Sequence, residues 1–311
     1  MATTTLWEDI VDALNAASGG PYPGHRAVHA KGTVCRGTFT PTPEASRISR
    51  AAHLQGDPVE VTVRFSNASG DPNTSDAHPI AGRGMAVQFH LPDGSETDIV
   101  SVPLVVFMVR TPEDFLAFTR ARVPDPETGH PDPEKLGAFL GEHPETGIAI
   151  QKSIGRLAPT TSFATSDYRG LHAFCLVDAE GGRHWGRYVW EPEEGLEYLT
   201  DEQREAVPRD YLQKEIRERL GSGIARFTLE FTLADEGDPL DDPTHEWEGE
   251  REVVELGELE ITEVVENPET PDEPLVFDPM RLTDGIEPSD DPILAARPKA
   301  YSVSIDRRCA V

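Results

Sequence analysis

Short runs in which apolar and polar residues alternate dominate this sequence, and such alternation is typical of β-strands with one buried face. The clearest run is VEVTVRF, residues 59–65. Within residues 82–100, two further runs flank a turn at Pro92-Asp93-Gly94. We expect additional strands after Gly32, at 173–177, at 186–190, at 225–234 and at 257–265.

Helical periodicity is confined to a few segments. Within residues 1–19, apolar residues at 6, 10, 11 and 14 predict a short amphipathic helix that ends at Gly19-Gly20. Thr111 and Pro112 suit the N-cap and the first position of a helix over 111–122. We also expect a short helix at 134–140 in an otherwise loop-like region 123–145, two helices split at Pro208 with the second closing at Gly221, and about two helical turns at 293–301 in an irregular tail that begins at Asn267.

Strands joined by hairpin-like turns, with helices inserted later, favour an α+β fold over alternating βαβ units. We therefore predict an antiparallel β-barrel core with appended helices. The sequence shows no internal repeat and no obvious linker. The expected organisation is an N-terminal helix over 1–19 followed by a single domain over 20–311.

The charge of the chain limits its partners. It carries 28 basic against 56 acidic residues, a formal net charge of −28. Such a surface repels nucleic acids and anionic membranes, so we expect neither as a partner. The N-terminus lacks the basic region of a signal peptide, and no apolar run approaches the roughly 20 residues that span a bilayer. The three cysteines are odd in number and far apart, which suits a reducing cytoplasm.

Residues 24–37, GHRAVHAKGTVCRG, hold the densest set of reactive side chains. The pattern predicts a strand entered from a loop, with His29 at its mouth, where an imidazole can face a cavity. On local grounds the commoner interpretation is a surface histidine in a basic loop, because most imidazoles have no catalytic task. Arg26, Lys31 and Cys35 accompany His29 in this stretch.

Three segments, in order along the chain, resemble the haem catalase family. RAVHAKG at 26–32 resembles its distal-histidine motif, residues 63–100 its following strand pair, and residues 277–308 its proximal segment, with GIEPS and R-x-x-x-Y. The likeness runs from about residue 20 to the C-terminus. Because the chain ends ten positions after Tyr301, it is most similar to the small catalase-related peroxidases, which lack the C-terminal helical domain.

The resemblance implies haem b, with Tyr301 as the axial ligand of the iron. The spacing agrees, because residues four apart on a helix are neighbours and Arg297 can reach the phenol oxygen of Tyr301. A nearby cation favours the phenolate, which is a strong ligand for ferric haem. By the same alignment, the arginines that bind the haem propionates are Arg26, Arg64 and Arg308, each of which also fits an ordinary surface ion pair.

On the distal side, the resemblance makes His29 the acid–base that moves the peroxide proton and Ser66 the residue that orients it. One position departs from the family: Val102 stands where catalases carry an asparagine that polarises peroxide. Losing that donor should weaken dismutation more than activation of the peroxide. The apolar residues expected against the haem face and channel are Val28, Phe107 and Phe115.

The resulting hypothesis is a cytoplasmic haem peroxidase of the catalase family. It activates hydrogen peroxide or an organic hydroperoxide, oxidises a small organic reductant and dismutates peroxide weakly at most. Two alternatives stay open: rearrangement of fatty-acid hydroperoxides, as in allene oxide synthases, and a non-enzymatic haem-binding or sensing role. We expect a monomer or homodimer, since the long N-terminal arm that interlocks catalase tetramers is missing.

Overall fold

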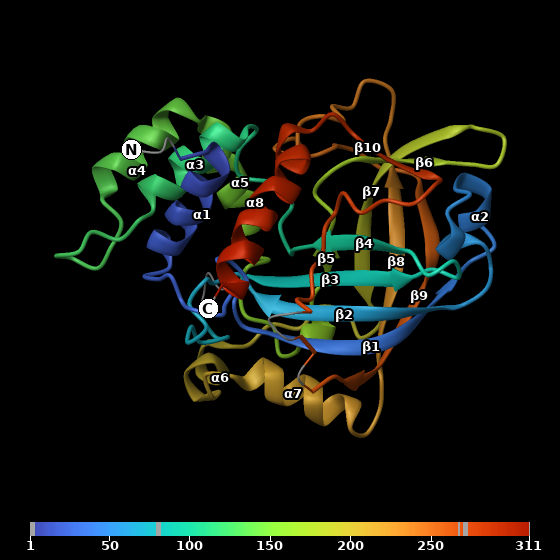
Figure 1. Ribbon diagram of the computed structural model, residues 1–311, viewed down its shortest axis with the longest axis horizontal. Helices are drawn as coiled ribbons and strands as arrows, with labels where there is room; N and C mark the ends of the chain where they lie inside the picture. Colours follow the sequence, from blue (N-terminus) through green and yellow to red (C-terminus); the bar gives the residue numbers. More distant parts are fainter. Residues whose placement is uncertain (1–3, 79–81, 267, 270–272, 311) are drawn as a thin grey trace.

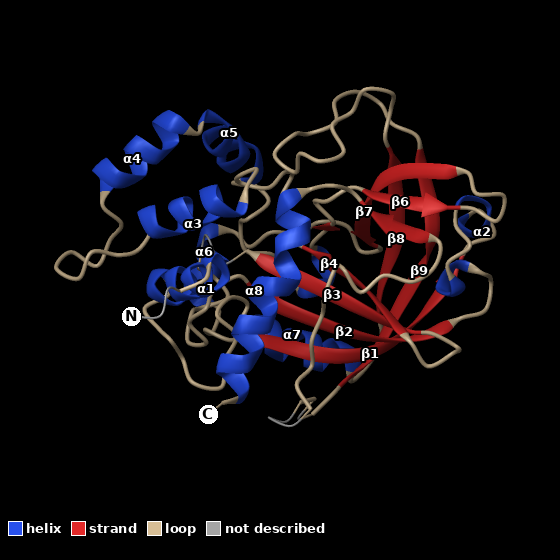
Figure 2. Ribbon diagram, turned by 45° about the horizontal axis from the view of Figure 1, so that its top comes forward, coloured by secondary structure: helices blue, strands red, loops and turns tan. Residues whose placement is uncertain are grey.

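The computed structural model describes residues 4–78, 82–266, 268–269 and 273–310. A curled antiparallel sheet forms one half of the molecule, and helices α1, α3, α4 and α5 gather in the other half (Figure 1). Helix α8 runs between the two halves, and α6 and α7 lie outside the sheet (Figures 1 and 2). The predicted α+β class with an antiparallel barrel core and appended helices is therefore confirmed.

The strands form one ten-stranded sheet with the order β10-β6-β7-β8-β9-β1-β2-β3-β4, and β5 pairs with β7. Every pairing between these strands is antiparallel. The strands are β1 (Gly32–Pro41), β2 (Val59–Asn67), β3 (Arg83–His90), β4 (Glu96–Ser101), β5 (Tyr168–Arg169), β6 (Phe174–Val177), β7 (Arg183–Pro192), β8 (Ala225–Leu233), β9 (Val253–Val264) and β10 (Ile286–Pro288).

The helices are mostly short and begin at recognisable caps. For example, the Thr111 hydroxyl accepts a hydrogen bond from the backbone N–H of Asp114 with Pro112 at the first turn, as the sequence predicts. The α-helices are α1 (Leu6–Ala17), α2 (Ala45–Ile48), α3 (Pro112–Ala121), α4 (Pro133–Glu142), α5 (Pro144–Ser153), α6 (Asp201–Ala206), α7 (Tyr211–Leu220) and α8 (Pro292–Cys309), and the 3₁₀ turns are η1 (Ala52–Leu54) and η2 (Phe163–Thr165).

The sheet curls around an aromatic core. Phe39 and Phe89 meet edge to face with ring centroids 5.2 Å apart, and Trp190 stacks on Phe89. These rings are fully buried and come from β1, β3 and β7. Alternation along each strand therefore sends every second side chain into one shared interior, which is the arrangement that the strand pattern predicts.

The chain just after β4 meets β5 at Val102. The backbone N–H of Val102 donates to the carbonyl of Arg169 at 3.1 Å, and that of Arg169 donates back at 2.8 Å. Because Arg169 belongs to β5, which pairs with β7, this bridge joins the end of β4 to the opposite side of the curled sheet. The backbone of Val102 is thus fixed by the closure of the barrel.

The helix expected at 134–140 is confirmed as α4, and two other points need correction. Helix α5 follows α4 directly, although the sequence predicts no helix at that position. Gly147 and the weak apolar periodicity of α5 hide it from sequence analysis, whereas Pro144 at its first turn begins it. Helix α8 continues to Cys309 instead of ending at Tyr301, because its later turns pack against α1.

The tail contains one further difference. Strand β10 pairs with β6 within a segment that we expect to be irregular, and its three residues are too few to produce a strand pattern. Asn267, where that predicted tail begins, lies outside the described residues, as do residues 1–3 of the predicted N-terminal helix and 79–81 of the predicted turn.

In the part of the chain that the structure describes, no helix is both long enough and apolar enough to cross a membrane.

Candidate active site

His29 lies in the loop just before β1 and has an unusual backbone conformation. Its φ of +57° is in the left-handed region, which costs a non-glycine residue roughly 1–2 kcal/mol. Two contacts hold the conformation: the N–H of Ala30 donates to the carbonyl of Ser69 at 2.9 Å, and Nη2 of Arg64 donates to the carbonyl of His29 at 2.9 Å. The imidazole is therefore aimed by long-range contacts with β2 and the loop after it.

The ring of His29 rests against Ser66 and Gly84. Its Nδ1 lies 2.9 Å from Oγ of Ser66, at the end of β2. A Cβ added at Gly84 would stand only 2.8 Å from Cε1 of His29 and 3.0 Å from Oγ of Ser66. Gly84 thus provides a cradle that a larger residue would fill, while Ser66 fixes the rotation of the ring.

The sheet register places Val102 in the same row. Ser66 pairs with Gly84 across β2 and β3, and Met85 pairs with Ser101 across β3 and β4. Cross-strand partners face the same side of a sheet, so one step beyond the last pair brings Val102 beside Gly84. The three predicted catalytic residues therefore converge at one barrel rim, although their roles stay predictions.

The surroundings of His29 keep its imidazole neutral. Burial lowers its pKa to about 3, and the positive charges of Arg64, Arg297 and Arg26 act in the same direction. Above that pKa, one ring nitrogen carries a lone pair and can accept a proton. The His29 imidazole can therefore accept a proton throughout the neutral pH range.

On α8, Arg297 and Tyr301 form the contact that their spacing predicts. Nε and Nη2 of Arg297 both donate to the phenol oxygen of Tyr301, at 3.0 and 2.6 Å. Residues four apart lie one turn from each other, so this pair forms within the helix itself. A phenol oxygen that receives two bonds from a cation is suited to carry negative charge and to bind a metal ion.

A buried pair that the sequence does not single out as functional lies at the N-terminus of the same helix. Asp291 caps α8 through bonds from the N–H groups of Ile293 and Leu294, and its other oxygen lies 2.6 Å from Nδ1 of His172. Burial lowers the pKa of His172 despite Asp291, and Arg297 adds to that effect. Asp291 is readable as a helix cap before Pro292, but nothing in the sequence pairs it with a residue 119 positions away.

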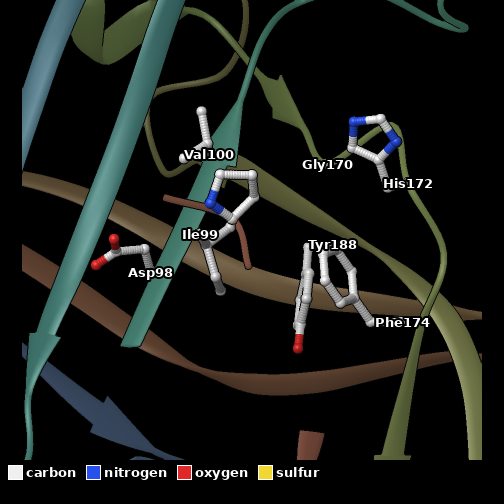
Figure 3. A pocket seen from close by; sticks show the side chains of 8 residues that line it. Asp98, Ile99, Val100, Gly170, His172, Phe174 and Tyr188 are labelled. Carbon is white, nitrogen blue, oxygen red and sulfur yellow. The ribbon is translucent and has the colours of Figure 1, made fainter. Parts of the chain in front are cut away.

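His172 also lines a small enclosed cavity between β4, β6 and β7 (Figure 3). The cavity measures about 10 Å³, close to the least space that holds one water molecule. Its other lining residues are Asp98, Ile99, Val100, Gly170, Phe174, Tyr188 and Pro279.

Two of the three arginines predicted to bind propionates contact one carboxylate, Glu269, and the third, Arg64, lies near them. Arg26 donates to both oxygens of Glu269, at 2.8 and 3.1 Å, and Nη1 of Arg308 lies 3.3 Å from the same group. Arg64 is buried nearby. Its burial lowers the pKa of its guanidinium, the charges of Arg26 and Arg308 lower it further, and Glu269 acts in the opposite direction. These four side chains are called the arginine cluster below.

The arginine cluster has more positive charge than its own carboxylate neutralises. Among the described residues, Arg64 makes no ion pair, and Nη1 of Arg308 is buried without a hydrogen-bond acceptor. Burying a cation without an anion is costly. The cluster is therefore built to accept further negative charge, such as the carboxylates of a ligand.

The predicted apolar wall is partly assembled. Phe107 and Phe115 stack with ring centroids 5.7 Å apart, and Phe107 also lies 6.4 Å from the ring of His172. Both phenylalanines pack against an apolar cluster that includes Ile293 of α8. Val28 is half-buried beside His29, and no described contact joins it to the two phenylalanines.

The histidine loop and α8 face each other. The N–H of Ala27 donates to Oγ of Ser304, one turn beyond Tyr301, at 3.4 Å. Arg26 of the loop and Arg308 of α8 share both Glu269 and the carbonyl of Leu275. An imidazole base, an arginine-bound phenol and a cationic cluster thus border one region, and they fit the needs of an iron porphyrin with two carboxylates.

This chain is similar to known proteins of one family over nearly its whole length. A family model described as catalase matches residues 23–311. A catalase-related peroxidase from Mycolicibacterium paratuberculosis is 39% identical over 98% of this chain and 95% of its own length. One from Synechococcus elongatus is 34% identical, with 99% and 90% coverage.

Longer proteins match over part of their length. A catalase from Helicobacter pylori is 27% identical over 89% of this chain and 57% of its own. Among solved structures, a bacterial catalase has a TM-score of 0.80 at 23% identity, and catalase A from Saccharomyces cerevisiae has 0.79 at 24%. Each covers 91% of this chain, which spans 57% and 61% of those proteins. These structures support the fold.

Proposed function

Because this chain belongs to the catalase family, we propose that it is a haem b-dependent peroxidase that activates hydrogen peroxide or organic hydroperoxides and oxidises small organic donors. The observation that carries the proposal is the opposition of a neutral, serine-anchored His29 to the arginine-bound phenol of Tyr301. The two relatives from Mycolicibacterium paratuberculosis and Synechococcus elongatus are both named catalase-related peroxidases. Their names support neither peroxide rearrangement nor a non-enzymatic role.

The residues of the site would hold the cofactor from three directions. Tyr301 would supply the oxygen that binds the iron, Arg297 would hold that oxygen through its two hydrogen bonds, and the arginine cluster would receive the propionates. Phe107, Phe115 and Val28 would contribute apolar contacts to the porphyrin and its channel. Haem bound at this site would supply the electrons for breaking the O–O bond of a peroxide, and a small organic donor would later return them.

The proton steps belong to His29. We assign the Nδ1 hydrogen to the bond with Ser66, which leaves the Nε2 lone pair free. Nε2 would accept a proton from one oxygen of the peroxide and return it to the other oxygen, which leaves as water or alcohol. Ser66 and the Gly84 cradle keep the ring in position for both transfers.

Val102 directs the proposed enzyme toward peroxidation. Its backbone is held by Arg169, so its side chain is the part that shapes the site. An isopropyl group donates no hydrogen bond to a second peroxide molecule, whose oxidation completes dismutation. A small organic donor, which needs no such bond, then becomes the better reductant.

The test is the Val102→Asn variant. We expect oxygen evolution from hydrogen peroxide to rise about tenfold relative to oxidation of an aromatic donor, since one well-placed donor contributes that much. Val253→Asn, at an exposed position on β9, should leave the ratio unchanged. Wild-type protein that dismutates peroxide faster than it oxidises donors would contradict the proposal.

An absorption spectrum tests the cofactor independently. Purified protein titrated with haem b should show a ferric spectrum typical of phenolate ligation, and peroxide should change it. Protein that binds no haem would refute the proposed function. A cytoplasmic location, a monomeric or homodimeric state, and the organisation as an N-terminal helix over 1–19 with one domain over 20–311 are part of the same proposal.

A further inference from the structure

Glu269 is the one residue of the arginine cluster that the proposed function does not use. It is half-buried, and 28% of its side-chain surface is exposed to solvent. Both oxygens are engaged by the fork of Arg26, and one also accepts the N–H of Leu275 at 3.1 Å. A bidentate guanidinium with an added backbone donor is the arrangement that recognises a carboxylate tightly.

The same donors are those that a propionate needs. Arg26 has Nη1 and Nη2 committed to Glu269, and Nη2 also donates to the carbonyl of Leu275 at 2.8 Å. A second carboxylate can bind this fork only if Glu269 leaves it. Arg64, which makes no ion pair among the described residues, offers a separate position that Glu269 leaves open, whereas Nη1 of Arg308 already lies 3.3 Å from Glu269.

We propose that Glu269 is an internal competitor for one of the two propionate positions and thereby sets the affinity of this protein for haem. One propionate binds at Arg64 without displacing any group of the chain. The other takes the place of the Glu269 carboxylate on Arg26. The inference rests on the proposed function, because it assumes that the arginine cluster receives propionates.

The electrostatics of Glu269 agree with this role. Burial by itself raises the pKa of its carboxyl, but Arg26, Arg308 and Arg64 together hold the pKa below its ordinary value. Glu269 is therefore ionised whenever haem is offered at neutral pH. Its negative charge both occupies the donors and repels an incoming propionate.

The alternative is a purely structural ion pair that links the histidine loop to α8. The two possibilities predict different results for Glu269→Gln, which keeps the shape of the side chain and removes its charge. A structural pair predicts lower thermal stability with unchanged haem affinity. A competitor predicts tighter binding of haem.

The experiment is a titration of the purified full chain with haem b and with haem dimethyl ester, whose propionates carry no charge. We expect Glu269→Gln to bind haem b about tenfold more tightly than wild type and to bind the dimethyl ester with wild-type affinity. Glu269→Ala provides a second variant, and thermal unfolding confirms that each protein is folded.

Glu266→Gln is the matched control, since Glu266 pairs with Arg217 in the same region and does not touch the arginine cluster. It should leave both affinities unchanged. Glu269 variants that bind haem b no more tightly than wild type would overturn the inference and leave the proposed function intact. Wild-type protein that binds no haem would overturn the proposed function itself.

Discussion

The two sides of the candidate site are built in opposite ways. On α8, Arg297 and Tyr301 meet within a single helical turn, so local geometry alone brings them together. At the barrel rim, His29, Ser66 and Gly84 come from separate segments and meet only through the sheet register. The helix side should therefore tolerate distant changes, whereas the rim side should be sensitive to small ones.

The largest effect is expected on the helix side. Tyr301→Phe removes the oxygen that would bind iron while keeping the ring, so we expect turnover of peroxide to fall to the level of free haem. Absorption spectra of the haem-loaded protein provide the measurement, with loss of the phenolate features as the direct readout. A variant with a wild-type spectrum would show that Tyr301 is not the ligand.

The rim side should lose chemistry and keep its cofactor. We expect His29→Ala to reduce peroxide turnover by roughly 10²–10⁴-fold, the contribution of one general acid–base, with haem affinity preserved. His25→Ala, at an exposed position in the same loop, is the control and should be fully active. Equal losses of haem from both variants would instead indicate that this loop is structural.

A single methyl group should distinguish the two sides most directly. Gly84→Ala places a Cβ 2.8 Å from the His29 ring, so the imidazole must shift. Displacements of about 1 Å in a catalytic group cost up to ~100-fold in rate, and we expect a loss of that order without loss of haem. Gly137→Ala in α4, where the added carbon meets nothing within 4 Å, should leave turnover at the wild-type level.

The smallest effect concerns a histidine of the barrel core. Burial lowers the pKa of His53 to about 3, and its Nδ1 has no partner. Between that value and 6.5, the unfolded chain binds a proton that the folded chain does not, so stability falls as pH falls, by up to about 1.4 kcal/mol per pH unit.

His53→Leu should remove this contribution, and chemical unfolding at several pH values measures it. The difference from wild type isolates His53 from Asp98, whose pKa burial raises to about 7 and whose effect has the opposite sign. Parallel curves for wild type and His53→Leu would mean that His53 does not titrate in this window.

The fold was largely predictable because its strands alternate cleanly. β2 and β8 match their predicted ranges closely, since each buries one face against the barrel core. Helix α5 escaped prediction because Gly147 and a weak apolar pattern give it little helical signal of its own. The later turns of α8 were not predicted because they are stabilised by contacts with α1, which include the ion pair between Asp12 and Arg307.

What the sequence determined by itself is local: the strand alternation, the helix caps, the Arg297–Tyr301 spacing and the motifs that resemble catalases. Only the tertiary structure placed Ser66, Gly84 and Val102 in one row beneath His29, joined Asp291 to His172, and brought Glu269 into the arginine cluster. The physical reason is that register and loop docking follow from the sum of many weak contacts over the whole barrel. The spacing of residues within a short segment cannot predict these contacts, because they join segments that are far apart in the sequence.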